Sequence, residues 1–361
     1  MKVERQSNIE LLRILAIMGV IVLHYGNPSM GGGLSYVKES SINSYVLYLV
    51  ISLFACAVDL FMIISGYFMC NSKAINLWKP LKLIIQVIIF RLGLYILSLL
   101  INGGELSVKT LLGRFIPVNY FVILYCTVYL LSPFINVLFE KLSLKSLKQF
   151  MICCFMLFSV YPTMVDVLSE LTGKQFLGLS SIGMYGSQWG YSVINFMLMY
   201  MIGAYIRKCD FKIDFLSSNK LFAFLGVCLG VLFLWAKMND TTGFFTERSA
   251  WEYCNPILIF EAVTIFILFK KMNLGVKGLI NRFAEGVFTV FLLHDRFIRR
   301  IGIMHYVNEN VIIMIFHIIV SVVAIYFICF LVYIIYGRVE NKVFSLFSQK
   351  IKLPLLKIES R

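Results

Sequence analysis

Residues 9–26 read IELLRILAIMGVIVLHYG, an apolar run of the length that spans a membrane as a helix. Arg13 and His24 interrupt the run. At about 100° per residue, eleven steps return His24 to within roughly 20° of Arg13, about 16 Å further along the axis. An arginine at the centre of a span costs about 2.5–3.5 kcal/mol. The face that the two side chains share is therefore predicted to look into protein or water.

The rest of the chain has the composition of a polytopic membrane protein. Of its 361 residues, 60% are hydrophobic and 14% are charged, and the mean hydropathy is +0.84. Soluble domains are about half apolar and a quarter charged. We therefore predict an all-α integral membrane protein with about ten transmembrane helices. The ten apolar stretches are 9–27, 44–70, 81–102, 119–139, 150–170, 189–206, 221–238, 253–269, 284–301 and 310–336.

Positive charges lie in short clusters between these stretches. The clusters on alternate connections, together with the two ends of the chain, hold 22 of the 33 lysines and arginines. This pattern is typical of membrane topology, so the net charge of +14 does not indicate a nucleic-acid partner. It predicts that both termini are cytoplasmic. It also divides the chain into a transmembrane domain over residues 1–345 and a basic cytoplasmic tail over 346–361.

Several kinds of site have no support in the sequence. None of the nine cysteines forms a Cys-x-x-Cys pair, and most lie in apolar runs, which favours small buried side chains. No His-Glu-x-x-His motif or cluster of carboxylates is present, so no metal is predicted. Phosphate-binding loops, dinucleotide fingerprints and the Gly-x-Ser-x-Gly motif of serine hydrolases are also absent.

Asp59 lies near the middle of the second span, in ACAVDLFMIISGYFM at 55–69. A carboxyl group at that depth is neutral, paired or directed into a wet cavity. Because the second span runs back after the first, Asp59 could meet His24 and orient its ring, as in acid–base triads. The alternative is a structural ion pair or hydrogen bond without chemistry.

The ninth span, AEGVFTVFLLHDRFIRR at 284–300, contains His294 and ends in three arginines. Basic residues at a predicted outer end could bind an anion or could stabilise the C-terminal end of the helix. His305 and His317 are interpreted as structural. The GlyGlyGly run at 31–33 indicates mobile backbone near a polar substrate or an ordinary connection.

Together these motifs resemble membrane-bound acyltransferase family 3 over nearly the whole chain. The resemblance rests on a basic residue separated from a histidine by ten residues, an Asp-Leu-Phe segment, a basic inner loop, an aromatic-rich fourth span and a Gly-to-His segment. Here these are Arg13 with His24, Asp59–Gly66, Lys73 to Lys82, YCTVYLLSPFIN at 125–136 and Gly286–His294.

The resemblance implies transfer of an acyl group, usually acetyl, from cytoplasmic acyl-coenzyme A to a hydroxyl of a surface polysaccharide or lipid-linked glycan. His24 is implied as the catalytic histidine, acting as general base, with Asp59 orienting it. Arg13 would hold a donor phosphate or polarise the path. The implied partners are acetyl-coenzyme A, membrane lipids and the glycan, in the cell membrane.

Further contacts are predicted beside this catalytic set. Lys79 and Lys82 are candidates for binding the phosphates of coenzyme A, although lysine stands where relatives often have an arginine pair and lacks arginine's bidentate fork. Tyr125, His294 and Arg296 are candidates for binding substrate. An acetyl-histidine intermediate, transfer of succinyl or a longer acyl group, and a glycan transporter or flippase without acyl chemistry stay open as alternatives.

Overall fold

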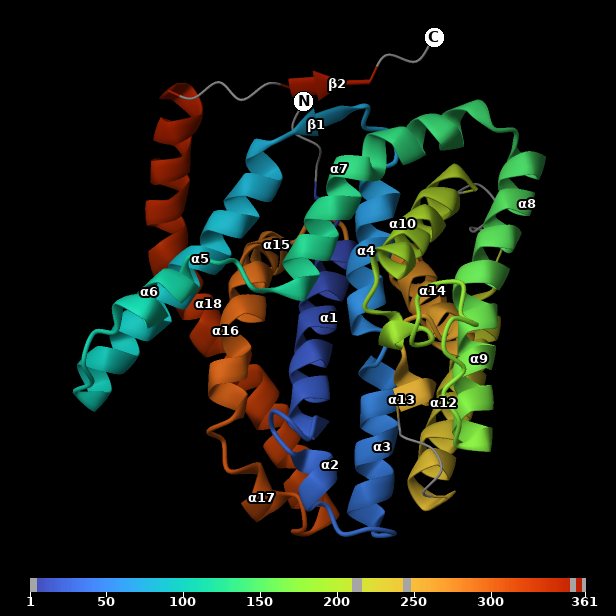
Figure 1. Cartoon of the computed structure of the whole chain (residues 1–361), viewed down its shortest axis with the longest axis horizontal. Coiled ribbons are helices and arrows are strands. Elements are labelled where there is room, and N and C mark those ends of the chain that lie inside the picture. The colour runs from blue at the N-terminus through green and yellow to red at the C-terminus, as the bar shows by residue number, and fades with distance from the viewer. Residues whose placement is uncertain (1–4, 210–215, 243–247, 351–354, 359–361) are drawn as a thin grey trace.

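Helix α1 (Ser7–Gly26) runs through the middle of a helical bundle in the computed structural model (Figure 1). The structure describes residues 5–209, 216–242, 248–350 and 355–358. Around α1 pack α3 (Ile42–Phe54), α4 (Ala57–Met69), α16 (Val287–Ile298) and α18 (Val311–Lys350). The most apolar stretch of α1 is 67% buried, as expected for a helix whose polar side chains face protein.

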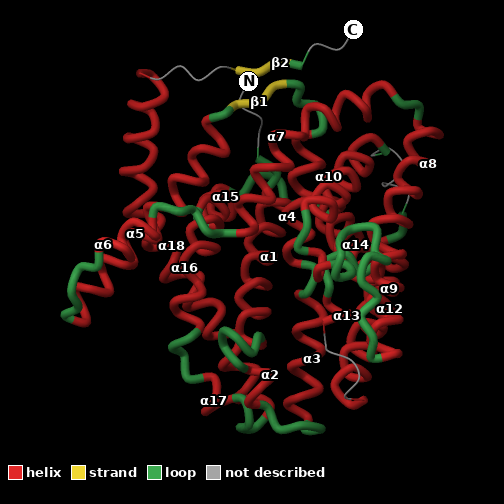
Figure 2. The backbone as a smooth tube through the Cα atoms, in the orientation of Figure 1, coloured by secondary structure: helices red, strands yellow, loops and turns green. Residues whose placement is uncertain are grey.

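Helices make up nearly all of the described chain, as Figure 2 shows. The other elements, in chain order, are α2 (Gly33–Tyr36), β1 (Ala74–Asn76), α5 (Trp78–Asn102), α6 (Val108–Arg114), α7 (Tyr120–Lys141), α8 (Leu144–Phe155), a π-helical turn (Met156–Val160), α9 (Tyr161–Thr172), a 3₁₀ turn (Gln188–Gly190), α10 (Val193–Lys208), α12 (Ser218–Thr242), α13 (Arg248–Trp251), α14 (Pro256–Lys271), α15 (Gly278–Glu285), α17 (Ile303–Tyr306) and β2 (Leu355–Lys357). The predicted all-α class is confirmed.

Eight segments of the described chain are long and apolar enough to cross a membrane. They are Ser7–Gly26, Ile42–Met69, Trp78–Asn102, Tyr120–Lys141, Leu144–Thr172, Ser218–Asn239, Ser249–Lys271 and Val311–Leu346. The other two predicted spans, 189–206 and 284–301, hold shorter helices: α10 has 16 residues and α16 has 12. At about 1.5 Å per residue, neither covers the roughly 30 Å of a hydrocarbon core alone. The count of ten therefore stays a prediction.

The outer helices α5 and α12 are much less buried than α1. Only 17% of the most apolar stretch of α5 and 22% of that of α12 is buried. Large apolar side chains such as Leu100, Leu234 and Phe316 are exposed on α5, α12 and α18. Apolar side chains that face outward in a membrane protein contact lipid tails. These three helices therefore form part of the lipid-facing surface.

Polar side chains at the helix starts set where the inner helices begin. Asn119 accepts a hydrogen bond from the backbone N–H of Val122 and caps α7. Ser192 caps α10 by accepting from the N–H of Asn195. Such caps satisfy amide groups that have no partner within the helix. The cap at Ser192 also fixes the first turn of α10, where Asn195 faces α4.

Helices α4 and α10 approach each other more closely than they could if Gly66 and Gly203 carried side chains. A Cβ atom added to Gly66 would lie 1.9 Å from the carbonyl oxygen of Tyr200, and one added to Gly203 would lie 2.1 Å from that of Ile63. Small residues allow backbones in membranes to come into direct contact. The two glycines therefore define this interface.

The C-terminal segment returns to the end of the bundle where α1 begins. Strand β2 pairs antiparallel with β1, with Ala74 opposite Lys357, and both lie at the upper end in Figure 1. Helix α18 continues to Lys350, so the tail predicted from residue 346 begins inside a helix. The start of α1 and β2 share one end, which agrees with an even number of crossings; the side of the membrane stays a prediction.

Candidate functional site

Two histidines meet where α1 ends. His24 in the last turn of α1 and His294 in α16 are joined by a hydrogen bond of 2.7 Å between His24 Nδ1 and His294 Nε2. Their ring centroids are 4.6 Å apart. His294 is buried, whereas His24 is half-buried and lines a cavity of about 630 Å³. The pair therefore has one member inside the protein and one at a cavity wall.

The partners of His294 indicate which nitrogens of the pair carry protons. His294 Nδ1 lies 3.0 Å from the carbonyl oxygen of Val290, which can only accept, so we assign the proton to Nδ1. In the neutral ring Nε2 is then an acceptor, and His24 must donate from its own Nδ1. His24 Nε2 keeps its lone pair, and no described residue is hydrogen bonded to it. A backbone carbonyl thus sets the tautomer of both rings.

Asp59 is not the partner of His24. Its Oδ1 accepts a hydrogen bond of 3.4 Å from Asn195 Nδ2, and its Oδ2 has no partner among the described residues. Both Asp59 and Asn195 are buried between α4 and α10. The predicted pairing of Asp59 with His24 is therefore not found. His24 pairs instead with His294, which was predicted to contact substrate.

Arg13 lines a second cavity further back along α1. This cavity of about 310 Å³ is largely apolar, with Arg13, Ser65 and Tyr125 as its polar side chains. Arg13 also makes an ion pair of 2.8 Å with Glu10, a residue that the sequence analysis did not single out. Tyr125 therefore belongs to the cavity of Arg13 and is not among the described residues that line the cavity of His24.

Aromatic rings lie between the two cavities. Phe121 and Phe291 line the Arg13 cavity, and their ring centroids are 5.0 Å apart. The ring of Phe291 is 6.1 Å from that of His294, and Phe196 packs against Phe121 at 5.6 Å. These phenylalanines, here called the aromatic septum, separate the arginine from the histidine pair.

The loop after α1 is held over the His24 cavity. The N–H of Gly31 donates to the carbonyl oxygen of His24 over 2.9 Å, and a Cβ at Gly31 would lie 2.7 Å from that oxygen. Arg299 Nη1 donates to the carbonyl oxygen of Ser29 over 2.7 Å, and its Nε contacts Asp295. The first of the three glycines is needed for close packing.

The arginines that end α16 thus differ in role. Arg299 fastens the loop after α1 to α16 through the carbonyl oxygen of Ser29. Arg296, a predicted substrate contact, is exposed and has no hydrogen bond to a described residue. It is also absent from the described lining of the His24 cavity.

The basic residues at the other end of the bundle are partly engaged within the protein. Lys82 forms an ion pair of 3.1 Å with the buried Glu340, and Lys79 lies 5.7 Å from the centroid of the Tyr129 ring. A cavity of about 430 Å³ at this end is lined by Arg207, Lys208 and other residues. Neither Arg207 nor Lys208 is among the contacts predicted from the sequence.

Two further possibilities are a metal site and a role for His317. Within the described ranges no group of three histidine, cysteine, aspartate or glutamate side chains could hold a metal ion. His317 Nδ1 is 2.9 Å from the hydroxyl of Tyr25, and the ring stacks on Tyr306. That arrangement supports the structural interpretation of His317.

Comparison with known proteins identifies the chain by its family. No curated protein and no solved structure matches it. A family model described as an acyltransferase domain matches residues 6–334, most of the 361 residues. The matched range includes Arg13, His24, Asp59 and His294. The chain therefore belongs to acyltransferase family 3 and is a multi-pass membrane enzyme that transfers an acyl group from a donor to an acceptor.

Proposed function

We propose that this enzyme transfers an acetyl group from cytoplasmic acetyl-coenzyme A to a hydroxyl of a cell-surface polysaccharide or lipid-linked glycan, with His24 as general base. The enzyme would act in the cell membrane with both termini in the cytoplasm, as the positive-inside pattern suggests. The observation that carries the proposal is the hydrogen-bond chain from Val290 through His294 to His24.

The reaction follows from the lone pair of His24 Nε2. The acceptor hydroxyl oxygen attacks the thioester carbonyl carbon, a C–O bond forms, and Nε2 takes the hydroxyl proton. Collapse of the tetrahedral intermediate breaks the C–S bond, and the departing sulfur takes the proton back from the imidazolium. His294 Nε2 accepts from His24 Nδ1 throughout, so it supports the positive ring as the aspartate does in acid–base triads.

The Arg13 cavity supports a path for the donor. A pantetheine arm is long, thin and carries phosphate at one end, which suits an apolar cavity with an arginine at its wall. Lys79 and the cavity of Arg207 and Lys208 add positive charge at the same end of the bundle. Lys82 contributes less, because Glu340 offsets its charge. The thioester would reach His24 by passing the aromatic septum.

The decisive experiment measures release of free coenzyme A by purified protein in lipid nanodiscs. We expect release from acetyl-coenzyme A to increase when a glycan acceptor is added, with the acetyl group recovered on the glycan. Succinyl- and longer acyl-coenzyme A serve as alternative donors. Movement of unmodified glycan across the membrane without consumption of any donor would identify a carrier and contradict the proposal.

Asp59→Asn tests the assignment of the histidine partner. Asparagine has the shape of aspartate and can keep the hydrogen bond to Asn195, so we expect transfer to remain within about fivefold of wild type. The rate of coenzyme A release at saturating donor measures this. A loss of a hundredfold or more in protein that remains folded would return Asp59 to a catalytic role.

A further inference from the structure

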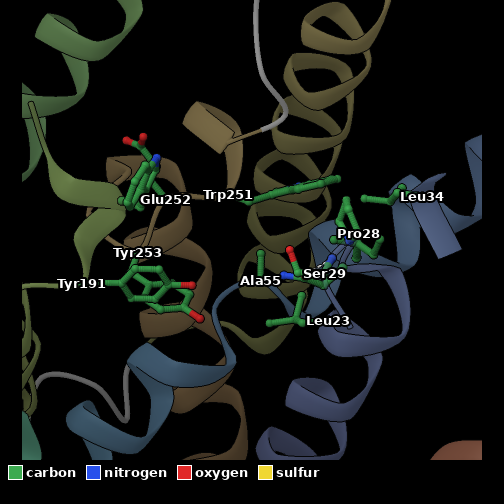
Figure 3. Close-up of a pocket in the computed structure, with 12 residues that line it drawn as sticks. Leu23, Pro28, Ser29, Leu34, Ala55, Tyr191, Trp251, Glu252 and Tyr253 are labelled. Carbon is green, nitrogen blue, oxygen red and sulfur yellow. Dashed lines mark hydrogen bonds between the residues drawn. The ribbon is translucent and has the colours of Figure 1, made fainter. Parts of the chain in front are cut away.

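An aromatic cleft opens beside the histidine pair. It has a volume of about 370 Å³ and lies between the loop after α1, with Asn27 and Ser29, and two segments that are distant in sequence (Figure 3). These segments are 189–191 and 251–253, and they supply Trp189, Tyr191, Trp251 and Tyr253 to the wall. Figure 3 shows Tyr191 and Tyr253 on one side and Leu23 and Ser29 on the other.

The rings of the cleft are held in place but partly uncovered. Trp189 is 48% exposed and Tyr191 is 44% exposed, so both rings present open faces. Trp251 Nε1 donates a hydrogen bond of 2.9 Å to Ser52 Oγ. Tyr191 and Tyr253 pack edge to face with centroids 4.9 Å apart. The wall is thus a fixed surface with apolar faces and polar edges.

The backbone that presents these rings is tightly constrained. Trp189 has a backbone φ of 56°, a value that residues other than glycine rarely adopt. The carbonyl oxygen of Trp189 accepts from the N–H of Tyr253, and a Cβ at Gly190 would lie 2.6 Å from the backbone nitrogen of Cys254. Ser187 Oγ donates to the buried Glu252. Strained backbone of this kind persists where surrounding contacts enforce it, and it occurs most often at functional sites.

The cleft adjoins the cavity that His24 lines. Leu23, Asn27, Tyr191 and Tyr253 line both spaces, and His24 lines the second. A ring seated on the aromatic wall would therefore lie next to the space beside His24.

The described lining of the cleft lacks a basic side chain that could bind an anion. Its one charged lining residue among those described is Glu252, and no lysine or arginine lines either the cleft or the His24 cavity within the described chain. An adjoining cavity adds Asp166 and Glu170. The nearest cation, Arg299, contacts the carbonyl oxygen of Ser29 but is already paired with Asp295. A carboxylate or phosphate would therefore find no unpaired cation among the described lining residues.

We propose that this cleft is the acceptor site and that it binds an uncharged pyranose ring, a neutral hexose or N-acetylhexosamine unit. This inference rests on the proposed function. The C–H face of such a ring packs on the tryptophan and tyrosine rings, while its hydroxyls reach Asn27, Ser29 and Glu252. Glycans made of uronic acids or of phosphodiester units are excluded as acceptors at this site.

Binding can be measured without turnover. Purified protein in nanodiscs is titrated calorimetrically with neutral tetrasaccharides of glucose, galactose or N-acetylglucosamine units, and with tetragalacturonate. We expect saturable binding of at least one neutral member and at least tenfold weaker binding of tetragalacturonate. Because Trp189 and Trp251 are two of only four tryptophans, binding should also change tryptophan fluorescence.

Two variants remove rings without disturbing the backbone. Trp189→Gly suits the positive φ, so the loop is retained, and Tyr191→Leu keeps an apolar side chain. Each should raise the dissociation constant of the neutral sugar by roughly tenfold or more. Trp78→Phe, on α5 at the opposite end of the bundle, is the matched control and should leave binding unchanged.

The outcomes separate this inference from the proposed function. No binding by any neutral member, equal binding of tetragalacturonate, or unchanged binding in both ring variants would overturn the acceptor site, even if acyl transfer is demonstrated. Binding that depends on Trp189, in a protein that consumes no acyl donor, would support the sugar site and overturn the proposed transfer.

Discussion

His24→Ala is expected to lower the rate of acyl transfer by roughly a hundred- to ten-thousandfold, the range that general acid–base groups contribute. The loss follows because His24 supplies the only imidazole among the described residues that line this cavity; His294 is buried and does not line it. The measurement is coenzyme A release in the presence of acceptor, with detergent-extracted protein checked for folding by size-exclusion chromatography. Full transfer by folded His24→Ala protein would remove the catalytic assignment.

His294 supplies a graded control for this result. His294→Leu removes the acceptor of the His24 Nδ1 proton and should strongly reduce the rate of transfer. His294→Gln can place an amide oxygen near the position of Nε2, so its rate should be at least tenfold higher than that of the leucine variant. A His294→Gln enzyme no more active than His294→Leu would contradict the proposed hydrogen-bond chain.

Intact-mass measurement after incubation with donor alone distinguishes the covalent route, because an acetyl-histidine intermediate adds the mass of the acyl group.

Gly203→Ala is expected to destabilise the protein by about 1–3 kcal/mol, the usual effect of overpacking. The new Cβ would lie 2.1 Å from the carbonyl oxygen of Ile63, and backbone cannot move aside as a flexible side chain can. Helices α4 and α10 must therefore separate, which also lengthens the contact between Asp59 and Asn195. Gly66→Ala should behave in the same way, because its Cβ meets the carbonyl oxygen of Tyr200.

The matched control is a glycine on a lipid-facing helix. Gly93 in α5 and Gly226 in α12 have no heavy atom within 4 Å of an added Cβ. Alanine at either position should be neutral or stabilising by up to about 1 kcal/mol, because alanine favours helix. Thermal unfolding in detergent compares the four variants. Equal stability of Gly203→Ala and Gly93→Ala would show that the close approach of α4 and α10 is wrong.

Apolar length and charge alternation were sufficient to predict the membrane-spanning helices with the strongest signals. They did not predict that α10 and α16 are short, because an apolar stretch continues in sequence past the residue where a helix ends. In the ninth stretch the break falls at Gly286, which separates α15 from α16. Helix ends of this kind depend on what packs around them, and hydropathy carries no such information.

The sequence singled out two residues of α1 that line cavities, but not the pairing of His24. His24 and Arg13 both line cavities along α1, as the shared helix face suggested. The partner of His24 was assigned to Asp59 because the second span follows the first, whereas the actual neighbour lies 270 residues away in α16. Periodicity gives the direction of a side chain on its own helix, but the neighbouring helix depends on close packing. For Asp59, that packing is the contact of α4 with α10 at Gly66 and Gly203.

The aromatic septum has a consequence for the membrane itself. An enzyme that joins a donor from one side to an acceptor on the other needs a cavity toward each face, and two such cavities in line would form a pore. The contact between Phe121 and Phe291 interrupts the line between Arg13 and His24 with apolar rings. In an enzyme with one cavity toward each face, apolar rings at this place would oppose the passage of ions and hydrated protons along α1 and so help to preserve the electrochemical gradient.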